Sequence, residues 1–571
     1  MSTDLLRRQL RQPVCRLLCS SEISPRQALP ICIAPASTHK SISPNRRSRT
    51  SSHNAIRMKP QSHGGRGLLA RNTILNLLGQ VLPMATGVVT IPYIVKGLGT
   101  DGYGILSIAF MVLGYFSIFD LGLSRATVKF VAEHLTPEKV HKVPELVWTS
   151  IGLLVALGSV VGGAAAVFVP VAVTHFFKMP SSFVGEAKAS LFILCASMPI
   201  MLGNDALRGV LEATQRFDLV NIVKVPGSIC FYLFAALAIP FGVKVPGIVL
   251  ILVLIRLTTA CVYLVMCCRA IPELLSRAAL SWKAVRPLAS FGGWVMVSNI
   301  TGPIFGNIER FLIASLLSVS ALTYYSVPFD LVGKITIFPS SIAPTLFPYF
   351  SYHGSGSKNV SDVTTRSIKY LLLLLTPITA IFLFFAKDIL QLWLGTQFAA
   401  ESTVVLQITA LMFFLNSFAY IPYTSVQALG RPHLKATLDL VALPTYAVTS
   451  WLLMRKMGIN GAALARLLIT VFDCGMLHFF AWRMKSFSVK DCVSGPLSRA
   501  FLASAGLLCT IGVIHSLHID LIRAALLLLC SMAGYVLVFW AQAVDDQERN
   551  TFRRLWRERT AFLRHQAAQS V

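Results

Sequence analysis

Charged side chains inside long apolar runs are the residues of this sequence with the most evident chemistry. A charge at the centre of a bilayer costs on the order of 3 kcal/mol or more, so each one needs a partner or a function. In an apolar cavity, ammonium and guanidinium groups can bind a phosphate, and arginine does so with a planar, two-pronged contact. The charged candidates for such a cavity are Arg256, Glu309, Arg310, Asp330, Lys334, Arg466 and Asp473.

Internal salt bridges are the alternative for several of these charges. Arg256 and Arg466 have no obvious partner nearby in the sequence, which favours the cavity for these two. The two pairs that could form locally are Asp330 with Lys334, which stand four residues apart, and Glu309 with Arg310.

Amide and aromatic side chains in the same runs could hydrogen-bond a polar solute. Asn72, Asn76 and Gln80 recur every four residues, which places them on one helix face. Such a face either joins helices or meets a wet cavity. The further polar candidates are Asn299, Asn307 and Tyr324.

Enzymatic and metal chemistry have no comparable support. The sequence contains no recognisable nucleophile–base pair and no carboxylate cluster of the kind that binds a metal. The 12 cysteines are scattered without CxxC or Cys/His spacing, so we predict no disulfide, no metal site and no catalytic residue.

Composition identifies the elements that must carry these residues as membrane helices. The chain is 54% hydrophobic and 13% charged, about half the charged share of a soluble protein. A formal net charge of +26 would suggest nucleic-acid binding in a soluble protein. Here the basic residues concentrate in short loops, where they set topology, so we predict no nucleic-acid partner.

The order of apolar runs predicts an all-α polytopic membrane protein with about 14 transmembrane helices. Residues 73–95 and 103–123 form the first hairpin, joined by a tight turn at 96–102. The predicted organisation is a six-helix bundle at 67–268, a cytoplasmic connector at 269–290, a second six-helix bundle at 291–482, two additional helices at 483–541 and an amphipathic cytoplasmic tail at 542–571.

Residues 1–66 differ from the rest because they are rich in Arg and Ser and contain no long apolar run. This composition predicts a disordered basic tail. Two other interpretations are an over-extended start, with the true start at Met58, and an organellar transit peptide, which we consider weaker.

An internal repeat relates the two predicted bundles. Residues 211–219 parallel residues 426–434 at a constant offset of 215, as from Ala213 to Ala428. An even number of helices in each half makes the repeats parallel, related by a pseudo-two-fold axis along the membrane normal. Two such bundles enclose a central cavity, which is the architecture of an alternating-access transporter. The excess of Lys and Arg in alternate loops places both termini in the cytoplasm.

With these patterns the chain resembles the polysaccharide-biosynthesis (Wzx-type, O-antigen) flippases of the MOP superfamily, relatives of the MATE transporters and of the lipid II flippases. The resemblance covers roughly residues 70–490. It rests on Asn76, Gly79, Ile91, Pro92, Tyr93, Leu98, Gly99, Gly102, Tyr103 and Gly104, on Phe119 to Leu123, on Asn307 to Ile313, on Tyr324, Tyr325 and Ser326, and on Pro344 to Pro348. Glu309 stands where the family usually has Asp.

The resemblance implies a MATE-like fold and a function. Members of the family move undecaprenyl-diphosphate-linked oligosaccharides across the bacterial inner (plasma) membrane, for O-antigen, capsule or exopolysaccharide synthesis. The implied partners are this lipid-linked glycan, the bilayer, and a glycan polymerase with its chain-length machinery. No cofactor is implied. A coupling ion or the membrane potential would drive the cycle, and the sequence does not identify which.

Two other functions stay open at this stage. A MATE-like exporter of small organic cations or drugs would need an acidic, aromatic cavity, whereas the intramembrane charges here are mixed and lean basic. A membrane glycan polymerase or ligase would carry a large external loop, and the predicted external turns are short. A scaffold for glycan assembly without transport is a third and weaker interpretation.

Overall fold

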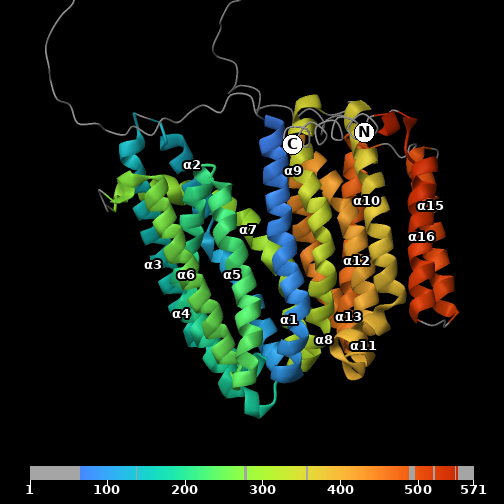
Figure 1. The fold of residues 1–571 in the computed structure, drawn as a ribbon. Helices are drawn as coiled ribbons and strands as arrows, with labels where there is room; N and C mark the ends of the chain where they lie inside the picture. Colours follow the sequence, from blue (N-terminus) through green and yellow to red (C-terminus); the bar gives the residue numbers. More distant parts are fainter. Residues whose placement is uncertain are drawn as a thin grey trace, which may run out of the picture. The chain divides into compact units, whose positions relative to one another are not determined.

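The computed structural model of the chain describes residues 65–136, 138–275, 280–354, 358–487, 495–517, 521–546 and 548–550. All regular secondary structure in these ranges is helical (Figure 1). Nine of the described helices are long and apolar enough to cross a membrane. The prediction of an all-α multi-pass membrane protein is thus confirmed, while the total of about 14 spans stays a prediction. The predicted tail at 1–66, apart from its last two residues, and residues 551–571 lie outside the described residues.

The first group of helices lies between residues 65 and 270. The group is α1 (Gly65–Phe116), α2 (Leu123–His134), α3 (Val143–Val171), α4 (Ser181–Ala213), α5 (Phe217–Ala238) and α6 (Val245–Ala270). Helix α1 is interrupted at Gly99, where φ is 71°, a conformation that suits glycine. This break is the turn of the predicted first hairpin. Helix α3 packs on α4, α4 on α6, and α1 on α5.

The second group is α7 (Trp282–Leu316), α8 (Val319–Gly333), α9 (Ile337–His353), α10 (Lys358–Phe384), α11 (Ala386–Leu394), α12 (Thr396–Ala428) and α13 (His433–Arg483). A short 3-10 turn at Lys334–Thr336 joins α8 to α9. Helix α13 is divided at Gly458, where φ is 57°. The last two helices, α15 (Pro496–Ser516) and α16 (Leu521–Gln542), lie side by side, and α15 packs against α10 (Figure 1).

Shorter elements complete the described chain. These are 3-10 helices at Ser117–Asp120, Val140–Lys142, Ile239–Phe241 and Pro272–Leu275, and a π-helical turn at Ala172–Phe176 that extends α3.

The turn after α4 and the turn after α12 have the same backbone geometry. Gln215 and Gly430, which are 215 residues apart, both have positive φ, at 58° and 75°. The hydrogen bonds around them also correspond at this offset: Arg216 N to Leu211 O (3.0 Å) matches Arg431 N to Val426 O (3.1 Å), and Gln215 N to Glu212 O (2.9 Å) matches Gly430 N to Gln427 O (3.0 Å). The sequence repeat therefore corresponds to a repeated turn in the structure.

The two groups of helices are hydrogen-bonded together at the end that carries the Gly99 break. Lys178, between α3 and α4, accepts a bond from Val319 N (3.0 Å) and donates from Nζ to Leu316 O (2.8 Å). The Thr323 hydroxyl donates to the carbonyl of Thr100 (2.7 Å). These bonds join α8 and the end of α7 to the first group, so the two groups are closed together at this end.

Candidate functional site

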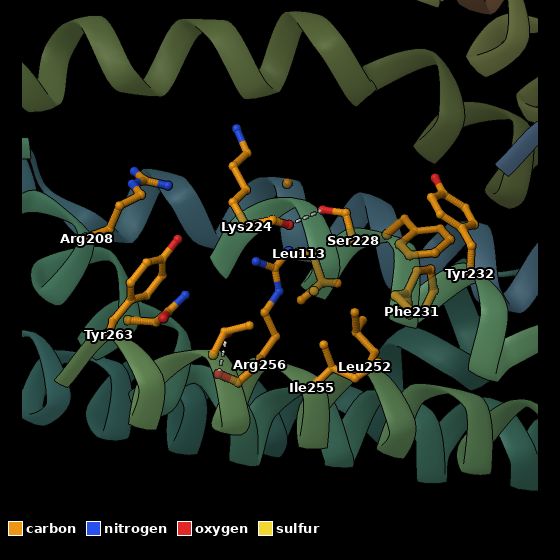
Figure 2. A pocket seen from close by; sticks show the side chains of 15 residues that line it. Leu113, Arg208, Lys224, Ser228, Phe231, Tyr232, Leu252, Ile255, Arg256 and Tyr263 are labelled. Carbon is orange, nitrogen blue, oxygen red and sulfur yellow. Dashed lines mark hydrogen bonds between the residues drawn. The ribbon is translucent and has the colours of Figure 1, made fainter. Parts of the chain in front are cut away.

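A hollow of about 430 Å³ lies among α1, α4, α5 and α6. Three basic side chains line it, Arg208 from α4, Lys224 from α5 and Arg256 from α6 (Figure 2). Helices α5 and α6 can approach closely beside it because Gly227 has no side chain. A Cβ at Gly227 would lie 2.9 Å from the Thr259 methyl carbon.

The three basic groups of this hollow differ in their partners. Arg208 forms ion pairs with Asp205 (3.2 Å) and Glu212 (3.3 Å) on its own helix, so its charge is balanced. Lys224 and Arg256 form no ion pair within the described part of the chain. Asp205 is close enough for its charge to interact with Arg256 as well. The hollow therefore carries a net positive charge.

A second hollow of about 520 Å³ continues from the first. Both are lined by Lys224, Ser228 and Tyr232, which stand at successive turns of α5. The second hollow is bounded by α1, α5, α8, α9 and α12, so it lies between the two groups of helices. We call the two joined hollows the central cavity.

The second hollow adds two of the predicted charges, Asp330 and Lys334, to the central cavity. The local pair expected between them does not form. Asp330 is instead paired with Arg310 of α7, and Lys334 has no ion pair among the residues that the structure describes. The reason is geometric: the helix changes to a 3-10 turn at Lys334, so the regular spacing of four residues is lost.

Glu309 and Arg466 are paired with each other outside the lining of the central cavity. Glu309 is 0% exposed and accepts a hydrogen bond from the Tyr446 hydroxyl (2.8 Å). Arg466 lies 3.7 Å from the same carboxylate oxygen and donates to the carbonyl of Phe305. Arg466 has no partner nearby in the sequence, and it is paired with the distant Glu309 because folding brings α13 against α7. The local pair of Glu309 with Arg310, considered from the sequence, does not form, because Glu309 is paired with Arg466 and Arg310 with Asp330.

Asp473 belongs to a separate cluster on α13. Lys435 donates to Asp473 (2.6 Å) and to Asp439 (2.8 Å), so one ammonium joins two carboxylates. This cluster does not line the central cavity.

Two of the predicted polar residues, Asn307 and Tyr324, lie outside the lining of the central cavity. Asn307 donates to the carbonyl of Pro303 (3.0 Å), one turn back on α7. The ring of Tyr324 packs against Phe398, with centroids 5.0 Å apart. The side chains of Asn76 and Asn299 lie outside the described residues. Of the predicted site residues, Arg256, Asp330 and Lys334 line the central cavity, and so does Gln80 of the predicted amide face.

Sequence reasoning missed Arg208 and Lys224. A usable signal was present for Lys224, because Lys224, Ser228 and Tyr232 recur every four residues in an otherwise apolar run. Arg208 could not be recognised from spacing alone. Among the described residues, no group of three or more His, Cys, Asp or Glu side chains could hold a metal ion.

Comparison with known sequences gives consistent results. The profile of a family described as "Polysaccharide biosynthesis protein" matches residues 69–353. A Shigella flexneri protein named "Putative O-antigen transporter" is 26% identical over 418 residues, which cover 73% of this chain and 99% of that protein. A Haloferax volcanii protein named "Probable low-salt glycan biosynthesis flippase Agl15" is 27% identical over 187 residues, or 32% of this chain and 39% of that protein. These relatives are named as a transporter and a flippase, not as enzymes.

Solved structures with the same fold are also transport proteins. The lipid II flippase MurJ, in an inward closed conformation, superposes with a TM-score of 0.63 at 14% identity, covering 83% of this chain and 99% of MurJ. A multidrug resistance MATE family transporter of the MOP superfamily, in an inward-facing conformation, gives a TM-score of 0.57 at 14% identity, covering 73% of this chain and 100% of the transporter. The fold is therefore MurJ-like and MATE-like.

Proposed function

We propose that the chain, which matches the profile of the polysaccharide biosynthesis protein family over residues 69–353, is a flippase for lipid-linked oligosaccharides. Its substrate would be an undecaprenyl-diphosphate-linked repeat unit of O-antigen, capsule or exopolysaccharide. The protein would carry this unit across the bacterial inner membrane by alternating access. The multi-pass helical fold and the named functions of the relatives support the proposal.

The observation that carries the proposal is the positive charge of the central cavity. Lys224, Arg256 and Lys334 line this cavity and form no ion pair among the described residues. Ionisable side chains within membrane-spanning helices are rare and commonly mark substrate or ion pathways, so these three cations support a role in substrate binding. A diphosphate can replace the water around such groups, and the guanidinium of Arg256 can bind two of its oxygens at once.

Alternating access is supported by where the two groups of helices are joined. The bonds of Lys178 and Thr323 hold them together at the end that the basic loops predict to be external. A cavity closed on that side would receive its substrate from the cytoplasm. In this proposal both termini are cytoplasmic, and a glycan polymerase with its chain-length machinery would use the exported unit.

The cavity charge also separates the proposal from export of organic cations. Lys224, Arg256 and Lys334 would repel a cationic drug in the central cavity. No cofactor or metal takes part in the proposed cycle. A coupling ion or the membrane potential would drive it.

The test uses cells that lack this protein. We expect loss of surface polysaccharide and accumulation of lipid-linked oligosaccharide in the inner leaflet, both corrected by the wild-type chain. Arg256→Ala, at the same abundance, should not correct them. The matched control is Arg269→Ala, since Arg269 lies on the same helix, in its last turn and outside the cavity lining. Normal polysaccharide with increased sensitivity to organic cations would contradict the flippase and support the exporter.

A further inference from the structure

A third hollow extends the central cavity along α9 and α12. Its volume is about 460 Å³, and it shares Ser340 with the central cavity. We call it the α9–α12 trough. No charged side chain lines it, in contrast to the basic hollow among α1, α4, α5 and α6. Its lining includes Ser340, Pro344 and Pro348 of α9 and Tyr420, Tyr423 and Gln427 of α12.

The α9 wall of the trough presents backbone acceptors. Pro344 and Pro348 lie inside α9 and have no N–H, so the carbonyls of Ser340 and Pro344 lack their usual helical donors. Each of these carbonyls lies on the same helix face as the proline four residues later, which has no N–H to donate to it. Inside a membrane, freed backbone groups are tolerated where they line a polar cavity. Two backbone carbonyls of α9 without helical donors therefore stand on the helix that forms one wall of a largely apolar trough.

The α12 wall combines aromatic rings with neutral polar groups. Gln427 donates from its amide nitrogen to the Tyr423 hydroxyl (2.6 Å), which leaves the Tyr423 proton and the Gln427 carbonyl oxygen for a ligand. The ring of Tyr420 lies one turn further along the same lining. Aromatic faces with a few neutral donors and acceptors suit a sugar, whose C–H face is apolar and whose edge carries hydroxyls.

We propose that the α9–α12 trough binds the glycan of the substrate while the cations of the central cavity bind its diphosphate. This inference rests on the proposed function and divides the substrate between the two groups of helices. On α12 the trough lining runs from Tyr420 to Gln427. At 1.5 Å per residue, these seven steps span roughly 10 Å, enough for part of a short oligosaccharide.

A hydrocarbon chain is the competing occupant, because most of the trough surface is apolar. Such a chain could not satisfy the carbonyls of Ser340 and Pro344 or use the Gln427–Tyr423 pair. It would also give no reason for the junction of the trough with the second hollow at Ser340.

The test measures the binding of two lipids to the full-length chain in nanodiscs. One probe is lipid-linked oligosaccharide extracted from cells that lack this protein, and the other is undecaprenyl diphosphate without sugar. We expect Gln427→Ala and Tyr423→Phe to weaken the first by about tenfold each, the effect of losing a hydrogen bond of about 1.4 kcal/mol. Neither variant should change the Kd of the second. Arg256→Ala should weaken both.

The controls separate this inference from the function on which it rests. Tyr352→Phe changes a tyrosine of α9 that is 87% exposed and outside the trough, and it should bind both lipids as the wild type does. If Gln427→Ala and Tyr423→Phe weaken both lipids equally, or neither, the glycan assignment is overturned while the flippase proposal stands. If the wild type binds neither lipid, the flippase proposal fails and the glycan assignment fails with it.

Discussion

Arg310 of α7 is paired with Asp330 of α8, and its guanidinium lies over the ring of Phe329 at 5.3 Å from the centroid. The two partners are unequally buried, since the side chain of Arg310 is 9% exposed and that of Asp330 is 43% exposed. Arg310 therefore anchors an aspartate that lines the central cavity, and it is not itself a free cation for a substrate.

The unequal burial predicts unequal effects of breaking this pair. Asp330→Asn leaves a buried guanidinium without its counter-charge and should destabilise the protein by about 3 kcal/mol. Arg310→Gln leaves a carboxylate that water can reach, so its cost should be smaller. Thermal unfolding of both purified variants in detergent checks the order. A larger loss for Arg310→Gln would contradict this account of the pair.

The Glu309–Arg466 pair gives a second prediction about stability. Arg466→Met leaves the fully buried Glu309 with the Tyr446 hydroxyl alone and should cost about 3–5 kcal/mol. Adding Glu309→Gln removes the unpaired charge, so the double variant should recover much of this loss. The measurement is the unfolding temperature of the two single variants and the double variant. Additive losses would show that the two residues are not coupled.

The repeated turn predicts different changes in stability for substitutions at its two positions with positive φ. Gly430 has φ of 75°, and Gly430→Ala forces a Cβ into the left-handed region at a cost of about 1–2 kcal/mol. Gln215 already bears that strain at φ of 58°, so Gln215→Gly should be neutral or stabilising. Thermal unfolding measures both changes. A stabilising Gly430→Ala would contradict the assigned turn geometry.

The sequence predicted local features of this fold well. The turn at Gly99 and the repeat around Ala213 and Ala428 depend on residues close together in the chain, and both are present in the structure. The partner of Arg466 was missed because Glu309 lies 157 residues away, and no spacing rule reaches that far. The tertiary packing of α7 against α13 decides such pairs.

The candidate site was predicted only in part, because it too combines residues that are distant in the sequence. Arg256 was identified because it is a lone charge in the middle of an apolar run. The cavity around it combines α1, α4, α5 and α6, and the sequence does not show that Arg208 and Lys224 face the same space. The α9–α12 trough depends on two helices whose contact is also long-range.

The cavity lysines should behave differently from the paired residues. Because Lys224 and Lys334 have no ion pair among the described residues, Lys224→Met and Lys334→Met should keep or slightly raise the unfolding temperature. Glycan export by the same cells should fall several-fold, since each variant removes a cation from the cavity. A fall in abundance that matches the fall in export would show instead that these lysines are structural.

The orientation can be tested at exposed positions of the described helices. Single cysteines at Ser182 and Gln397 should react with a membrane-impermeant thiol reagent from outside, and one at Tyr352 should not. The background must lack the native cysteines, some of which are exposed, such as Cys261 and Cys509. Labelling of Tyr352→Cys alone would reverse the proposed topology.

The central claim is that the cations of the central cavity carry a lipid-linked glycan across the bilayer. Its most direct test is the rate at which lipid-linked oligosaccharide in proteoliposomes becomes accessible to membrane-impermeant periodate. We predict rapid exposure of the whole pool with the wild type and with Arg269→Ala. Arg256→Lys should be slower because it keeps the charge and loses the two-pronged contact, and Arg256→Ala should expose only the share that began in the outer leaflet. Wild-type rates from Arg256→Ala would contradict the account.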